Sequence, residues 1–168
     1  MAVTVPSASI TLSLRHTLQS ALDLETAQSI LNQSYDDSMT TGTSANQVDK
    51  VWSDSRTLAA TSETLDLAGS LTDAFGSTVT FVKVRTILIH NTSTTTTEVL
   101  AVGGAAGTQF VNWVANSSDI VNIGPDGIFL LHSPIDGYAV GAGASDFLKI
   151  DAGADTITYE IIIWGTSA

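Results

Sequence analysis

The segment ITYEIIIWG, residues 157–165, decides the fold class of this 168-residue chain. Alternate side chains of a β-strand point to opposite faces, and here one set is wholly apolar or aromatic while the other is half apolar. One set consists of Ile157, Tyr159, Ile161 and Ile163, and the other consists of Thr158, Glu160, Ile162 and Trp164. The segment therefore predicts a long internal strand that closes a sheet.

A second long strand is expected at TVTFVKVRTILIH, residues 78–90. Apolar side chains again lie on both faces, which is typical of a central strand with packing partners on either side. Shorter apolar segments are separated by turn sequences such as Gly124-Pro-Asp-Gly127 and Asp136-Gly137. From Trp52 onward this spacing predicts an all-β fold, an antiparallel β-sandwich of the jelly-roll kind.

The N-terminal quarter of the chain has a less regular pattern. Apolar and polar residues alternate over residues 10–14, as in a strand with one buried face. The segment ALDLETAQSILNQ, residues 21–33, fits a short helix, and the overlapping SILNQSY, residues 29–35, fits a strand. Residues 40–44, TTGTS, have the composition of a linker. We therefore predict an irregular N-terminal arm or extra strands over residues 1–45 and a β-sandwich domain over residues 46–168.

Charge and composition exclude several classes of partner. Six Lys and Arg residues against 17 Asp and Glu residues give a formal charge of −11, and the basic residues are scattered singly. Nucleic acids and anionic membrane surfaces require clustered basic residues, so we expect neither as a partner. The absence of cysteine excludes disulfides and thiolate metal sites. The first residues, MAVTVPSASITLSL, lack the features of a secretory signal, so we expect synthesis in a cytoplasm without a cleaved leader.

The sequence contains no motif that indicates catalysis. His16, His90 and His132 stand at the ends of expected strands, and no nucleophile elbow, zinc helix or phosphate-binding loop accompanies them. The acidic turn of residues 151–155 could offer oxygen ligands to calcium, but such residues more often cap backbone amides. We therefore expect a protein that is not an enzyme and has no metal or cofactor.

The best candidates for an interaction surface are an uncharged loop and two tryptophans. The loop NTSTTTT, residues 91–97, joins two expected strands and could contact a neighbouring subunit or form an ordinary hairpin tip. Apolar neighbours favour a core or interface position for the tryptophans over a sugar-stacking surface. The candidate interface residues are Asn91, Thr94, Thr95, Thr96, Thr97, Trp52 and Trp113.

Residues 41–93 contain two distinctive segments, ANQVDKVWSDSRTLAA at residues 45–60 and LDLAGSLTDAFG at residues 65–76. Through these segments the chain resembles small virion proteins of tailed bacteriophages, and the resemblance covers about three quarters of its length. It continues through VLAVGGAAGTQFVNWV, GPDGIFLLHSPIDGYAV and DFLKIDAGADTITYEIIIWG.

This resemblance implies a β-sandwich or jelly-roll structural subunit without catalytic residues. The expected role is a decoration or cement protein, or a head-spike subunit, on the capsid surface of the virion, bound to the phage major capsid protein. The alternative is a receptor- or carbohydrate-binding module of a tail or spike. The high apolar content and the open β edges also lead us to expect a homo-oligomer, a trimer.

Overall fold

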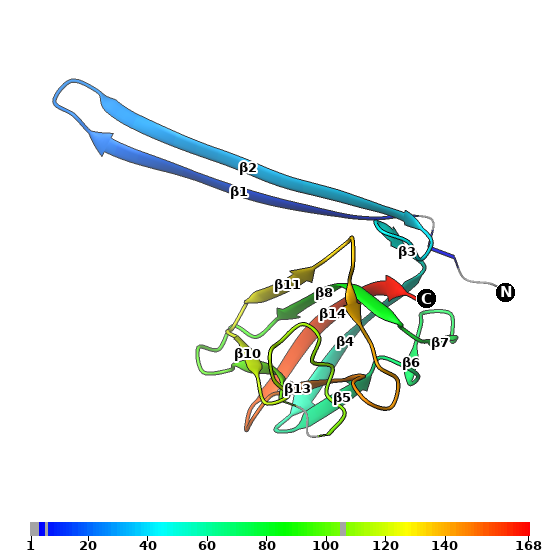
Figure 1. The fold of residues 1–168 in the computed structure, drawn as a ribbon. Coiled ribbons are helices and arrows are strands. Elements are labelled where there is room, and N and C mark those ends of the chain that lie inside the picture. The colour runs from blue at the N-terminus through cyan, green and yellow to red at the C-terminus, as the bar shows by residue number, and fades with distance from the viewer. Residues whose placement is uncertain (1–3, 6, 105–106) are drawn as a thin grey trace.

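The computed structural model describes residues 4–5, 7–104 and 107–168 and contains two parts, a β-sandwich body and a long hairpin that projects from it (Figure 1). No helix occurs among the described residues, and the all-β prediction is confirmed. Residues 1–3 of the expected arm lie outside the described residues.

The body consists of two facing antiparallel sheets. The sheet nearer the hairpin, here called the hairpin-side sheet, has the order β11-β8-β14-β4, and the distal sheet has the order β10-β9-β13-β5. The strands of the hairpin-side sheet are β4 (Lys50–Ala59), β8 (Lys83–Asn91), β11 (Ile128–His132) and β14 (Thr156–Thr166), and β12 (Tyr138–Ala139) also pairs with β8. The strands of the distal sheet are β5 (Ser62–Asp66), β9 (Leu100–Gly103), β10 (Ile120–Ile123) and β13 (Phe147–Asp151).

The pairing of these strands is that of a jelly roll. Among the eight principal strands of the body, the first pairs with the last (β4 with β14) and the second with the seventh (β5 with β13). The third pairs with the sixth (β8 with β11) and the fourth with the fifth (β9 with β10). A long hairpin rolled into two sheets has this nested order, which combines two Greek keys.

The strand β14 is internal, as the sequence predicts for residues 157–165. It lies between β4 and β8, and its side chains Ile157, Tyr159, Ile161 and Ile163 are fully buried between the two sheets. The distal sheet covers them with Leu100, Val102, Leu148 and Ile150, which belong to the same core cluster.

The prediction of one strand over residues 78–90 is wrong in part. The segment is divided into β7 (Thr78–Val79), which pairs with β6 (Leu71–Thr72), and β8, which begins at Lys83. Between them, the Phe81 amide donates to the Leu67 carbonyl and the Val82 amide donates to the Thr166 carbonyl. These bonds draw the backbone out of a single ladder and end β7 before β8 starts.

The N-terminal part forms strands, and the alternative of a helix over residues 21–33 is wrong. β1 (Ser7–Ala21) and β2 (Thr26–Thr41) pair antiparallel along their whole length, from Ser7 opposite Thr40 to Ala21 opposite Thr26. The arm is thus more regular than its sequence indicates. β2 is rich in Ser, Thr, Asn and Gln, a composition in which cross-strand pairing with β1 outweighs a weak helix propensity.

The hairpin returns to the body through a short, well-bonded turn. Thr40 and Thr41, expected to be part of a linker, belong to β2 and pair in parallel with β3 (Gln47–Val48). The Asn46 amide donates to the Pro134 carbonyl at 2.8 Å and ties the turn to the loop after β11.

Candidate assembly surface

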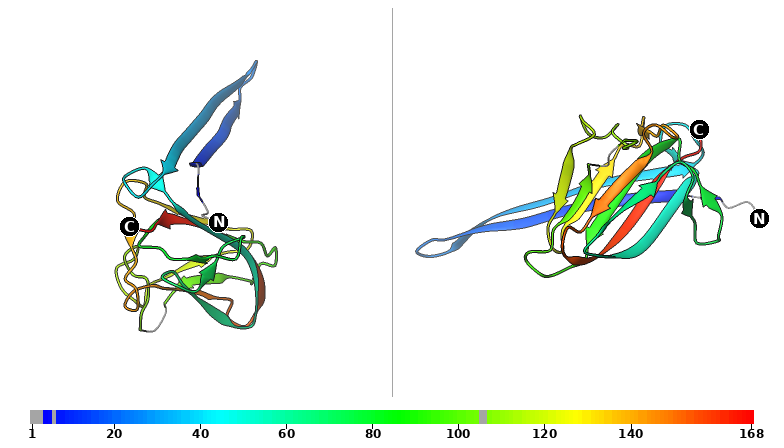
Figure 2. Two further views of the ribbon diagram at one scale, coloured as in Figure 1. Left: turned by 90° about the vertical axis from the view of Figure 1, so that its right-hand side faces the viewer. Right: turned by 90° about the horizontal axis from the view of Figure 1, so that it is seen from below.

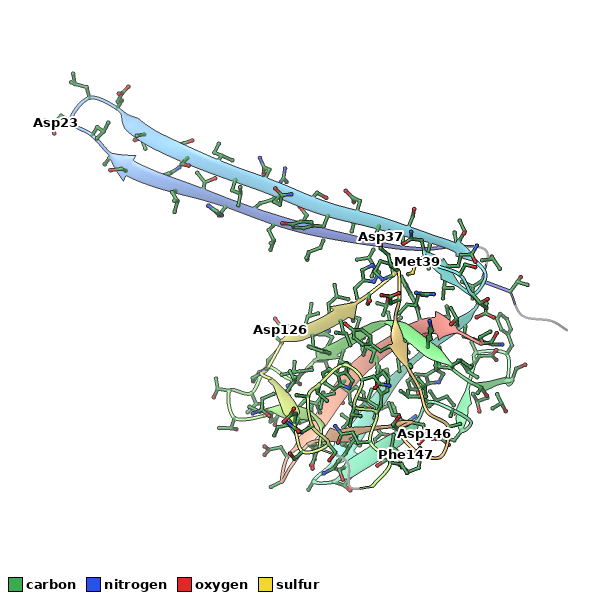
Figure 3. All side chains as sticks on the ribbon, viewed as in Figure 1. Asp23, Asp37, Met39, Asp126, Asp146 and Phe147 are labelled. Atoms are coloured by element: carbon green, nitrogen blue, oxygen red, sulfur yellow. The ribbon has the colours of Figure 1, made fainter. Side chains whose placement is uncertain are left out.

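The two faces of the hairpin differ in polarity because β1 and β2 pair in register. One face, here called the hairpin apolar face, gathers apolar side chains from both strands. Beyond the body it presents Ile10, Leu12, Leu14, Leu18, Leu31 and Tyr35. The opposite face is mostly polar, although it includes the exposed Ile30, and the hydroxyl of Thr11 donates to Asp36 at 2.8 Å. Figure 3 shows that the side chains of the hairpin project from both sides of its ribbon, clear of the body over most of its length.

The hairpin apolar face is exposed over most of its length. Leu14 is 53% exposed and Leu18 is 64% exposed. Full burial of one such side chain stabilises a structure by about 1.5–3 kcal/mol, and an isolated two-stranded hairpin is only marginally stable in water. An exposed face with this many apolar side chains marks a contact site for another molecule.

At its root the same face already packs on the body. Ala8 and Met39 are buried in a small cluster with Val48, and Val51 and Trp164 of the hairpin-side sheet pack against this cluster. This contact fixes the direction in which the hairpin leaves the body. Figure 3 labels Met39 and Asp37 at this junction.

A hydrogen-bonded chain of three residues adds a polar connection at the root. Asp37 Oδ2 lies 2.9 Å from His132 Nε2, and His132 Nδ1 lies 2.9 Å from the hydroxyl of Thr86. A carboxylate, an imidazole and a hydroxyl in this order also occur in hydrolases. Here the hydroxyl belongs to a buried residue of β8, so it is closed to a substrate. The chain joins β2, β11 and β8 and holds the hairpin to the body.

Arg85 stabilises the turn at the root of the hairpin by hydrogen bonds to backbone carbonyls. Its side chain is 1% exposed and donates to the carbonyls of Pro134 at 2.8 Å, Ile135 at 2.6 Å and Ser44 at 3.0 Å. Burial lowers the pKa of Arg85 from its ordinary value. The carbonyl acceptors satisfy a charge that would otherwise be costly to bury, so Arg85 links the turn after β2 to the loop after β11.

An open groove of about 600 Å³ lies beside the root of the hairpin. Its apolar wall includes Val5, Val51, Trp164 and Phe75, and the Phe75 side chain is largely exposed. The groove continues the apolar surface of the root and is open to solvent.

The outer face of the hairpin-side sheet is also apolar and only partly covered. Ile162, Leu88 and Leu130 lie side by side across β14, β8 and β11, and each is half-buried. Ile128, at the edge of the same face, is 66% exposed. This outer sheet face lies next to Trp164 and His132, which contact the root of the hairpin.

The interface candidates predicted from sequence differ in their exposure to solvent. Trp52 is 3% exposed and belongs to the core. Asn91 is buried and donates to the carbonyls of Glu98 at 2.9 Å and Ile123 at 3.1 Å, so it fastens the loop before β9. Neither side chain is free to contact a partner. Thr94, Thr95, Thr96 and Thr97 are exposed in that loop.

Trp113 is half-buried and does not present a flat open face. Its ring lies 5.5 Å from that of Phe129, tilted by 55°, and its indole N–H donates to the Phe110 carbonyl at 2.9 Å. This geometry is that of an aromatic pair that packs at the edge of the core.

The hairpin apolar face was not among the candidates, although a signal for it exists. The alternation of Ile10, Leu12 and Leu14 predicts one buried face, and a second segment of similar length follows the turn of residues 22–25. Pairing the two segments about this turn would have placed Leu12 opposite Tyr35.

Several charged groups of the body form a hydrogen-bonded cluster with one another. Arg56 pairs with Glu63 at 2.6 Å and with Asp54 at 2.8 Å, and the hydroxyl of Tyr159 donates to Glu63 at 2.7 Å. The hydrogen bond that Arg56 donates to Glu63 raises the pKa of Arg56, and burial raises the pKa of Tyr159. Both groups are therefore held in their protonated forms, and this cluster is a structural network between β4, β5 and β14.

The acidic residues of the turns accept hydrogen bonds from backbone amides or pair with nearby basic side chains. Asp151 accepts from the Gly153 amide at 2.9 Å and pairs with Lys149, and Asp126 lies 3.2 Å from His90. Within residues 4–5, 7–104 and 107–168, no group of three His, Cys, Asp or Glu residues is arranged to hold a metal ion.

Comparisons of the chain with models of protein families, with curated proteins and with solved structures found no match. In the part of the chain that the structure describes, no helix has the length and apolarity needed to cross a membrane.

Proposed function

We propose that this protein is a non-enzymatic structural protein of a tailed-phage virion, a decoration or cement protein or a head-spike subunit at the capsid surface. The phage assignment comes from the sequence resemblance. The observation that carries an assembly function is the projecting hairpin, whose apolar face is exposed from Leu12 to the turn at residues 22–25. A chain that functioned alone would lose stability by exposing this surface.

The jelly-roll body is compatible with this proposal but does not distinguish it from the alternative. Jelly rolls occur in viral capsid proteins and in lectins. A carbohydrate-binding module would need an exposed flat ring, whereas Trp52 is buried and Trp113 packs on Phe129. These two tryptophans therefore give the carbohydrate-binding alternative little support.

The charge of the chain fits a position on the outside of a shell. At −11, a protein that lined the interior would repel packaged DNA. Much of the outer surface of the body is polar, and its exposed Thr94–Thr97 loop is available for a shell contact.

Electron microscopy of intact particles, with mass spectrometry of the same preparation, tests the proposal. We expect the chain on the outside of the head in multiple copies. Recombinant protein should also bind shells that lack it and make them more resistant to heat. Absence from purified particles, or a position at the tail tip together with glycan binding, would contradict the proposal.

A further inference from the structure

Two apolar surfaces of one chain face each other at the root of the hairpin and then diverge. The hairpin apolar face packs on the hairpin-side sheet through Ala8 and Met39, but every residue from Thr11 to Asp36 is exposed. Below it, the outer sheet face of Ile162, Leu88, Leu130 and Ile128 remains open. Within one chain, neither surface covers the other.

The outer half of the hairpin extends past the body. Figure 1 and the right-hand view of Figure 2 both show the turn between β1 and β2 well beyond the edge of the two sheets. Leu18, Leu22 and Leu24 lie on this overhanging part and are exposed. Only another molecule can cover them.

We infer that the hairpin apolar face of one subunit packs on the outer sheet face of a second copy of this chain. This inference rests on the proposed function as a structural subunit and names its partner. The contact extends one that already exists: at the root, the same hairpin face lies on Val51 and Trp164 of the same sheet face. Trp164 and Ile162 are consecutive outward-facing residues of β14, so the outer sheet face continues this contact surface.

The outer part of the hairpin apolar face carries no carboxylate, whereas the outer sheet face carries one exposed carboxylate, Glu160, which lies 3.6 Å from His90. Each chain has a formal charge of −11, so two bodies repel each other across most of their surfaces. From Leu12 to Leu18 and from Ser29 to Tyr35, the hairpin apolar face carries no carboxylate, and its titratable groups are His16 and Tyr35. The carboxylate nearer the root, Asp37, is bonded to His132 of its own chain.

The area of one hairpin–sheet contact is small, and a closed ring doubles the area that each subunit buries. The paired residues from Thr11 to Ala21 span about 40 Å at about 3.4 Å per residue, and a two-stranded face is about 10 Å wide. Each hairpin can thus bury about 400 Å² of its own surface, and each subunit loses a similar area of its sheet face to a neighbour. One contact thus buries about 800 Å² over both partners, below the roughly 1,200 Å² at which standard specific interfaces begin, whereas a ring gives each subunit two such contacts.

The contact joins two different surfaces and is therefore heterologous, so it can close into a ring. In a trimer each subunit gives one hairpin and receives one. This arrangement would meet the expectation of a homotrimer.

Disulfide trapping between two variants tests the contact, because the chain has no cysteine of its own. One variant carries Leu14→Cys on the hairpin apolar face, and the other carries Ile128→Cys on the outer sheet face, with tags of different size. A disulfide between the two can form only between molecules. We expect a mixed disulfide under mild oxidation, identified by mass spectrometry of the joined peptides.

The matched control moves the hairpin cysteine by one residue. Ser13→Cys stands on the polar face of the same strand, so we expect at least five-fold less mixed disulfide with Ile128→Cys. Sedimentation of the unmodified chain should show oligomers, and Leu14→Asp should weaken association at least ten-fold while Ser13→Asp leaves it within two-fold.

Three results would overturn the inference. They are a monomer at all accessible concentrations, equal trapping from Ser13→Cys and Leu14→Cys, or disulfides of Leu14→Cys only with itself. A monomer that still binds shells would overturn the self-association and leave the proposed function standing. Oligomers trapped as expected, from a protein absent from every particle, would support the inference and contradict the proposed function.

Discussion

The body and the hairpin are both built from antiparallel strands with alternating apolar side chains, yet only the body covers an apolar face completely, the inner face of each sheet. Ile161 of β14 is fully buried beneath the distal sheet, whereas Leu14 of β1 is 53% exposed. The difference is a matter of layers, because a second sheet lies about 10 Å from the first in the body and nothing lies over the hairpin. Alternation thus shows which face needs a partner and does not show where the partner comes from.

The largest expected effect follows from placing a charge in the core of the body. Ile161→Asp should prevent folding, because an unpaired buried carboxylate costs at least several kcal/mol, comparable to the stability of a small domain. Circular dichroism and chemical denaturation of the purified variant measure this loss. Soluble protein with an unchanged melting temperature would show that β14 is not an internal strand.

An aspartate placed in the hairpin tests whether its apolar face is uncovered in the monomer. Leu14→Asp should change the free energy of unfolding of the monomer by less than about 0.5 kcal/mol, since exposed positions tolerate most changes. The measurement is made at concentrations low enough to avoid association. An equal loss of stability in both variants would mean that the body covers the hairpin in solution, and the comparison would fail.

A loss smaller than that of Ile161→Asp and larger than that of Leu14→Asp is expected where the two parts join. Arg85→Met should destabilise the chain by about 2–3 kcal/mol, because it removes charge-assisted hydrogen bonds and leaves carbonyls such as those of Pro134 and Ser44 without a donor. Hydrogen exchange at the Asn46 amide should accelerate in the variant. Arg15→Met, at an exposed arginine of the hairpin, is the control and should change stability by less than about 0.5 kcal/mol.

Removal of the hairpin tests whether the body is self-sufficient. A chain that begins at Ala45 should fold with a cooperative melt and lose about 1–2 kcal/mol, because Ala8 and Met39 no longer cover Val48 and Trp164. Its binding to shells that lack the protein should weaken by a factor of roughly 100, since a tethered contact is lost. Calorimetry and a shell pull-down measure the two effects. An insoluble product, or unchanged shell binding, would contradict the separation of roles.

The smallest loss expected in the body comes from removing a surface ion pair. A hydrogen bond from Lys149 and one from the Gly153 amide hold the pKa of Asp151 below its ordinary value. The folded state therefore gains stability above the unfolded pKa of about 3.9 and loses it as the pH falls through the lower folded pKa. Asp151→Asn should cost less than about 1 kcal/mol near neutral pH, and the difference from the native chain should vanish in strong acid. Chemical denaturation of both chains near neutral pH and in strong acid checks this pH dependence. A stability difference that is the same at both pH values would contradict it.

The body could be predicted from sequence to a useful degree. Residues 157–165 and the regular turns after Trp52 led to an antiparallel jelly-roll sandwich, because alternation and turn residues are local signals. The division of residues 78–90 could not be predicted, since it depends on bonds from Phe81 and Val82 to Leu67 and Thr166, which lie far apart in the chain.

The assembly surface was predicted less well. Trp52 and Asn91 looked suitable for contacts by residue type, but the fold places one in the core and uses the other to fasten a loop. Leu14 and Tyr35 were not singled out, because a lone alternating segment does not reveal its cross-strand partner.

By itself, the sequence determined the period of the strands, the turns between them and the acidic, cysteine-free composition, since these depend on residues close together in the chain. The tertiary structure alone decided that residues 26–33 are strand, that Arg85 and His132 hold the hairpin to the body, and that one hairpin face remains uncovered. The physical reason is that burial depends on which segments meet in space. Leu12 and Ile163 stand in similar local patterns, and only the presence or absence of a second layer makes one exposed and the other buried.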